Sequence, residues 1–214
     1  MNHSIRLLLA LPVIACLISS CKKDAPVTPA TTTTVTPESP GVYFKSDPGD
    51  YWVYTYVDID TNNVETAHGT DSVYVAPDTV INGNTYHTYR GTWYTIPRTW
   101  HWRDSSYCIV NESGHVLFTT QLFNQTIDSI GDSAVYYGLY KVPSVQAAIT
   151  VPAGTYTTYD RLGEMHMLLT NYPWGTIRYT HSNYASHVGL VREQEFYSSS
   201  PGVIERQLVR YHVN

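Results

Sequence analysis

The segment YWVYTYVDI, Tyr51–Ile59, decides the fold class of this chain. It consists almost entirely of aromatic and β-branched residues, which favour extended strands. Successive side chains of a strand point to opposite faces, so Trp52, Tyr54 and Tyr56 share one face and the residues between them share the other. Neither face is plainly polar. The segment therefore predicts a sheet that is covered on both faces or curved around something.

The same composition continues to the end of the chain. All nineteen tyrosines and all five tryptophans lie after residue 40, mixed with threonine and valine in short runs that Gly, Pro, Asn and Asp interrupt. We predict an all-β domain with at most one or two short helices. Further strands are expected at 64–75, 85–94, 99–110, 116–121, 135–142, 155–169, 176–180, 188–197 and 203–213.

Turn signals join several of these strands. Asn82-Gly83 predicts a two-residue type I′ turn, and Asn111 to Gly114 predicts a turn that closes with glycine in the left-handed region. Residues 198–202 join the last two strands. Residues 122–130 place apolar side chains at nearly helical spacing, which predicts a short helix or a covering loop, and 144–148 is a weaker helical candidate.

The N-terminus carries a targeting signal. Arg6 precedes twelve apolar residues, 7–18, and two serines come directly before Cys21, which is the layout of a secretory signal. As a helix the apolar run would reach only ~18 Å, too short for a hydrocarbon core of roughly 30 Å. Residues 18–21 resemble a bacterial lipobox, which implies a signal peptide over 1–20 and acylation of Cys21. The alternative is an ordinary secretory signal with an incidental cysteine.

The rest of the chain divides into a tether and one domain. Residues 21–40 are rich in proline and threonine and predict a disordered tether. Residues 41–214 have the length of a single domain. The net charge of −5 and the lack of a Lys/Arg cluster argue against a nucleic-acid partner. Cys108 is expected to be a buried small hydrophobe, with no internal disulfide partner.

The densest aromatic and polar neighbourhood is the candidate ligand site. Alternation places Trp100, Trp102 and Asp104 on one face of a strand, and Trp93 and Tyr94 precede them. Clustered aromatic side chains beside a carboxylate can stack on sugar rings or hold an apolar molecule. The competing interpretation, which we favour at this level, is that these tryptophans pack a sheet face.

Other candidate chemistry has weaker support. Glu164, His166, His181 and His187 could supply metal ligands, but their spacing matches no metal motif, and we expect neither a metal nor a cofactor. Gly-x-Ser-x-Gly and glycine-rich phosphate loops are missing from the sequence, so we predict no enzyme. The charged residues of the last two predicted strands are expected to form a solvated face of cross-strand pairs; they are Arg192, Glu193, Glu195, Glu205, Arg206 and Arg210.

Three motifs carry a family resemblance. They are Tyr43-Phe44 followed by Gly49 and the 52–56 aromatics, Val151-Pro152-Ala153-Gly154-Thr155-Tyr156, and Tyr184-Ala185 before Val188-Gly189-Leu190-Val191. This pattern resembles small uncharacterised Bacteroidota-type outer-membrane lipoproteins. The resemblance implies a curved antiparallel sheet, a half-barrel or barrel-like fold broadly similar to lipoprotein carriers, and it implies no catalytic residues.

These observations predict a lipid-anchored outer-membrane protein. The membrane is its expected partner, through lipid on Cys21, and an apolar or glycan molecule is its expected ligand. Two alternatives stay open: a structural or assembly protein that contacts other envelope proteins, and an envelope hydrolase.

Overall fold

The computed structural model describes residues 38–132 and 134–214. The predicted signal peptide, Cys21 and nearly all of the predicted tether lie outside these residues. One short 3₁₀ helix, η1, is followed by thirteen strands. Their bounds are η1 Pro40–Tyr43, β1 Tyr51–Ile59, β2 Glu65–Ile81, β3 Asn84–Trp93, β4 Ile96–Ser105, β5 Cys108–Asn111, β6 Val116–Thr119, β7 Thr126–Asp132, β8 Tyr136–Lys141, β9 Ala147–Val151, β10 Gly154–Met167, β11 Ile177–Ala185, β12 Gly189–Phe196 and β13 Val203–His212. None of the described helices is long and apolar enough to cross a membrane.

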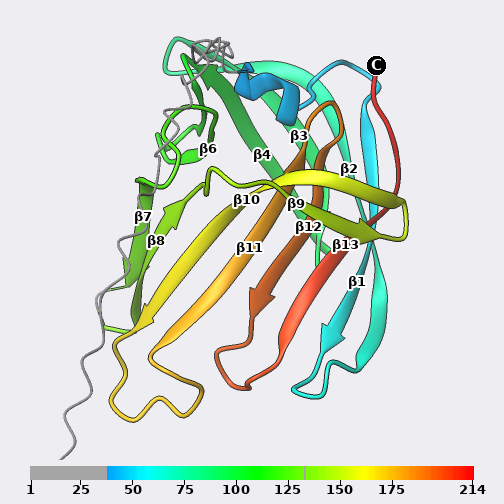
Figure 1. The fold of residues 1–214 in the computed structure, drawn as a ribbon. Coiled ribbons are helices and arrows are strands. Elements are labelled where there is room, and N and C mark those ends of the chain that lie inside the picture. The colour runs from blue at the N-terminus through cyan, green and yellow to red at the C-terminus, as the bar shows by residue number, and fades with distance from the viewer. Residues whose placement is uncertain (1–37, 133) are drawn as a thin grey trace, which may run out of the picture. The chain divides into compact units, whose positions relative to one another are not determined.

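The strands form one antiparallel sheet that curls into a nearly closed barrel (Figure 1). Its order is β6-β5-β4-β3-β2-β1-β13-β12-β11-β10-β8-β7, and β9 pairs with β10 beside this path. The first and last strands of the path, β6 and β7, lie against each other. His115, next to β6, bonds through Nδ1 to Oδ1 of Asp128 on β7 at 3.0 Å. The predicted all-β, barrel-like fold is therefore confirmed.

Long strands that change partners bend the sheet. β2 pairs with β1 over Glu65 to Tyr74 and with β3 over Val73 to Ile81. Its pairing with β3 shifts register between Ala76 and Thr79, and such irregularities increase local twist and bending. β10 likewise pairs first with β9 and then with β8 and β11. The β9–β10 hairpin lies across β12 and β13 (Figure 1).

The predicted turns are confirmed. Asn82 and Gly83 both have positive φ, at 50° and 80°, and join β2 to β3. The N–H of Gly114 donates to the carbonyl of Asn111 at 3.0 Å, and φ of Gly114 is 84°. Residues 197–202 connect β12 to β13.

Three expected elements differ from the structure. The run 99–110 is two strands, because Ser106 adopts a φ of 58° and turns the chain between β4 and β5. The helical candidate at 122–130 is wrong, since its second half is β7, whose backbone groups pair with β8. The candidate at 144–148 instead leads into β9. In both places, pairing with a neighbouring strand satisfies the backbone hydrogen bonds. The spacing of the apolar side chains therefore does not determine the secondary structure.

Two groups of buried side chains pack inside the barrel. One surrounds Trp52, Tyr54 and Tyr89, and the other surrounds Tyr43, Phe44 and Phe118. Trp102 packs against both groups. η1 contacts β5 and β12 and delivers Tyr43 and Phe44 into the second group. Cys108 is buried, as predicted.

Candidate functional site

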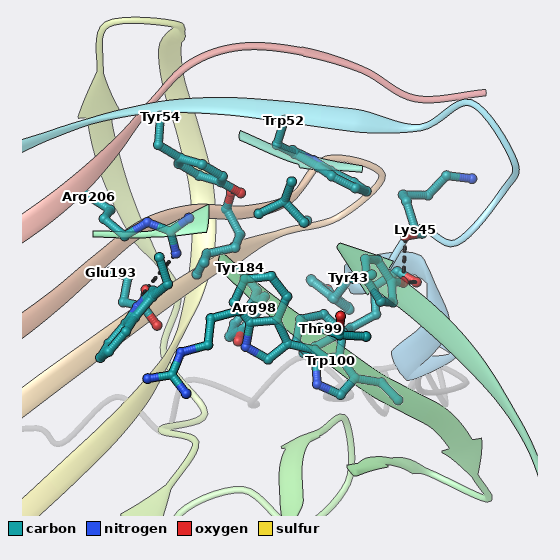
Figure 2. Close-up of a pocket in the computed structure, with 17 residues that line it drawn as sticks. Tyr43, Lys45, Trp52, Tyr54, Arg98, Thr99, Trp100, Tyr184, Glu193 and Arg206 are labelled. Atoms are coloured by element: carbon teal, nitrogen blue, oxygen red, sulfur yellow. Dashed lines mark hydrogen bonds and ion pairs between the residues drawn. The ribbon is translucent and has the colours of Figure 1, made fainter. Parts of the chain in front are cut away.

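A cavity of about 450 Å³ opens into the interior of the barrel (Figure 2). Four of the chain's five tryptophans line it; Trp174 does not. The lining residues come from the end of η1 and the segment after it, from β1 to β4 and from β11 to β13. They are Tyr43, Phe44, Lys45, Trp52, Tyr54, Val73, Tyr89, Trp93, Arg98, Thr99, Trp100, Trp102, Tyr184, Gly189, Leu190, Glu193 and Arg206.

The structure brings together three of the five predicted site residues. Trp93, Trp100 and Trp102 line the cavity. Asp104 lines a smaller neighbouring cavity of about 250 Å³, and Trp102 belongs to the walls of both. Tyr94 lines neither; its ring packs against Tyr56 at 5.5 Å between centroids. Trp100 and Trp102 also pack against the buried group around Trp52, as the interpretation favoured from the sequence expects, and both line the cavity as well.

The polar ends of several wall side chains are tied to the backbone. Trp52 Nε1 donates to the Val188 carbonyl at 2.6 Å, and the Tyr54 hydroxyl donates to the Leu190 carbonyl at 3.0 Å. The Tyr89 hydroxyl donates to the Lys45 carbonyl at 2.7 Å. Burial raises the pKa of the Tyr54 and Tyr89 hydroxyls, so both remain protonated donors. These bonds fix the three rings in the cavity wall.

Gly189 allows the backbone of β12 to approach the Trp52 ring closely. Its φ is +97°, a region that L side chains rarely adopt. A Cβ at this position would lie 3.4 Å from Trp52 Nε1. The sequence predicts a bulge or close-packing point at this glycine, and the register between β11 and β12 indeed shifts nearby, between Asn183 and Tyr184.

An ion-pair network forms one end of the cavity. Arg206 Nη1 lies 2.9 Å from Glu193 Oε2, and Arg206 Nε lies 3.1 Å from Asp71 Oδ2. The Arg206 guanidinium also lies over the Tyr54 ring, at 4.5 Å from its centroid. Trp93 Nε1 donates to Glu193 Oε2 at 3.1 Å. The network joins β2, β3, β12 and β13 across the barrel.

This network corrects the predicted solvated face of the last two strands. The Arg206 side chain is only 3% exposed, and Asp71 is fully buried. Glu193 stands opposite Arg206 as cross-strand pairing requires, but both face the interior. Arg192 and Glu205 form a separate pair at 3.8 Å, and Glu205 is also buried. Sequence alternation placed these charged residues in the same region of two neighbouring strands and did not identify which face was inside.

Asp71 also holds the β3–β4 hairpin. Its two carboxylate oxygens accept the backbone N–H groups of Tyr94 at 2.7 Å and of Thr95 at 3.0 Å. Both turn residues have positive φ, at 49° and 65°, although neither is glycine or asparagine. The carboxylate compensates for an unfavourable backbone conformation and keeps Trp93 directed at Glu193.

Arg98 is the one cavity-lining cation that the described residues leave without a carboxylate partner. Lys45 pairs with Asp47 at 3.2 Å, and Arg206 has two acidic partners. Arg98 is exposed, and its guanidinium carbon lies 5.7 Å from the centroid of the Trp93 ring. Arg98 and Trp100 alternate on β4, so they share a face of that strand (Figure 2).

The residues named from the sequence as candidate metal ligands do not lie together in the structure. His166 lies 2.8 Å from Glu164, His181 pairs with Asp160 at 2.7 Å, and His187 lies 3.7 Å from Glu38. Within residues 38–132 and 134–214 there is no group of three or more His, Cys, Asp or Glu side chains that could hold a metal ion. Each of these three histidines pairs with a different carboxylate.

Sequence reasoning missed much of the cavity wall. Phe44 and Trp52 lie in the first resemblance motif and Tyr184 lies in the third, but they were not predicted from the sequence to line a ligand site. Alternation along 51–59 places Trp52 and Tyr54 on one face, and this is the sequence feature that could have indicated them as wall residues. No local pattern connects them with Glu193 or Arg206, which lie far along the chain.

Comparison with known proteins supports the fold. No protein-family model and no curated protein matches the sequence. The structure is similar to a candidate exported protein with a YmcC-like fold from Bacteroides fragilis, with a TM-score of 0.52 and 12% identity. It is also similar to a candidate lipoprotein from Parabacteroides distasonis, with a TM-score of 0.51 and 12% identity. Each likeness covers 79% of this chain and 98% of the other.

Proposed function

We propose that this protein is a lipid-anchored lipoprotein of the outer membrane that binds an apolar or glycan molecule in the barrel cavity, without catalysis. The observation that carries the binding function is the convergence of Trp52, Trp93, Trp100 and Trp102 on one cavity. Ligand sites are typically concave, largely apolar and aromatic, with a few placed polar groups. Glu193 and Arg98 are such groups here.

The envelope location is supported by three independent observations. The N-terminal sequence resembles a lipoprotein signal with Cys21 at its lipobox. The quoted motifs resemble Bacteroidota-type lipoproteins, and the two similar structures are described as a candidate exported protein and a candidate lipoprotein. An acyl group on Cys21 would hold the domain at the membrane, and two or more chains would hold it stably.

Binding is tested with N-phenyl-1-naphthylamine, an uncharged aromatic dye that fluoresces in apolar surroundings. The purified full chain should bind one dye molecule per chain. Trp100→Ala should weaken binding about tenfold, since truncating an aromatic contact in a pocket costs ~1–2 kcal/mol. Trp174→Ala is the matched control, because Trp174 lies outside the lining. Binding that is absent, or equally weakened in both variants, would refute a specific ligand cavity.

A further inference from the structure

We propose that the ligand is a flat aromatic molecule with one anionic group, and that Arg98 binds this group at the mouth of the cavity. The inference rests on the function proposed above, because it specifies the chemical class of ligand for the same cavity. It follows from the shape of the walls and from the distribution of charge.

The walls favour a flat ring over an acyl chain. Val73 and Leu190 are the only aliphatic side chains among the lining residues, and the remaining apolar wall is aromatic. Aromatic rings pack best against other rings, in offset or edge-to-face arrangements. An acyl chain gains nothing from this geometry beyond the area that it buries.

The hydrogen bonds of the walls disfavour a sugar. Trp52, Tyr54 and Tyr89 donate their polar hydrogens to backbone carbonyls, and Trp93 donates to Glu193. A buried sugar needs partners for several hydroxyl groups, and each hydroxyl without a partner costs ~1–3 kcal/mol. These four donors of the wall are therefore not free to bind the hydroxyl groups of a sugar.

The charges favour an anion at the mouth. Glu193 is bound by Arg206 and Trp93, so its charge is locally compensated. Arg98 has no carboxylate partner in the described part of the chain, and a guanidinium matches a planar carboxylate with two parallel hydrogen bonds. A ring that stacks on Trp93 or Trp100 would direct a substituent toward Arg98, since Arg98 lies beside Trp93 and shares a face of β4 with Trp100.

The test compares 2-naphthoate with 2-naphthalenemethanol at pH 7 by titration calorimetry on the full chain. The two probes share one ring system and differ in charge. We expect 2-naphthoate to bind about fivefold to tenfold more tightly, in keeping with a charged hydrogen bond at a partly solvated site. Arg98→Gln should abolish this preference, so that the variant binds the two probes with equal affinity. Arg210→Gln is the matched control, because Arg210 is exposed and lies outside the lining.

The outcomes separate this inference from the proposed function. Equal affinities for the two probes, or a preference that survives Arg98→Gln, would overturn the anion contact while the cavity remains a binding site. Dodecanoate binding more tightly than 2-naphthoate would overturn the flat-ring inference. If neither naphthalene probe nor the uncharged dye binds, the proposed ligand-binding function fails and this inference fails with it.

Discussion

Glu195 is a carboxyl group on β12 that the barrel holds largely away from water. Burial raises its pKa to about 8, and the nearby negative charge of Glu193 raises it in the same direction. Arg161 on β10 acts in the opposite direction and offsets only part of this effect. At neutral pH the Glu195 side chain is therefore mostly protonated.

This raised pKa predicts that stability falls as pH rises. Below the ordinary value of 4.5, the carboxyl is protonated in the folded and unfolded chains and makes no difference. Between pH 4.5 and about 8 the unfolded chain loses the proton and the folded chain keeps it, so the free energy of unfolding declines. At about 1.4 kcal/mol per pKa unit, the shift of Glu195 from 4.5 to about 8 should account for a decline on the order of 5 kcal/mol.

Glu195→Gln tests this assignment because the amide cannot ionise. Urea unfolding at pH 5 and pH 9 should show a smaller decline for this variant than for the unchanged chain. Glu65→Gln serves as the control, since Glu65 is exposed on β2. A decline of the same size in Glu195→Gln would show that other groups cause the pH dependence.

At the scale of elements, the β3–β4 hairpin shows how a tertiary contact overrides local preference. Two-residue hairpin turns of this kind favour Asn-Gly, because both central residues need positive φ. This hairpin has Tyr94 and the β-branched Thr95 there instead. Asp71 from β2 accepts both of their N–H groups, and Arg206 in turn neutralises Asp71. A third strand, β2, therefore stabilises the conformation of the β3–β4 turn.

Thr95→Gly should stabilise the protein by about 1 kcal/mol, because glycine removes the steric cost of positive φ and retains the N–H that Asp71 accepts. The measurement is the free energy of unfolding in urea. Thr70→Gly provides the contrast: Thr70 is exposed in β2 and has no positive φ, so glycine there should destabilise by ~0.5–1 kcal/mol. Loss of stability in both variants would mean that the turn carries no such strain.

At the scale of the whole molecule, the barrel is closed by the pairing of its first and last strands in sequence and by the contact between β6 and β7. β1 pairs with β13 over nine residue pairs, with Tyr51 opposite His212. At the other side, β6 and β7 meet through His115 and Asp128. The described domain begins next to η1, so residues preceding Glu38 connect it to the proposed lipid at Cys21.

The proposed anchor is tested on the whole molecule. Cys21→Ser should move the protein from the membrane fraction to the soluble fraction and abolish incorporation of labelled palmitate, because serine lacks the thiol that is acylated. Cys108→Ala should leave both unchanged, since Cys108 is buried in the domain. Membrane retention of Cys21→Ser would contradict the lipid anchor.

The sequence by itself determined the all-β class, most strand positions and the turns at Asn82-Gly83 and Asn111 to Gly114. These features depend on residue propensities and on interactions within a few positions, which a single sequence contains. It also identified Trp93, Trp100 and Trp102 as a cluster. The sequence did not predict β7, where pairing with β8 outweighs the helical spacing of the apolar side chains.

Only the tertiary structure decided which faces point inward and which residues meet. Alternation shows which side chains share a face, but burial of that face depends on how the whole sheet curls. Arg206 was therefore expected in water and is buried beside Asp71. The cavity likewise brings together Trp52, Trp93 and Trp100 from three different strands, through strand pairings that no local pattern specifies.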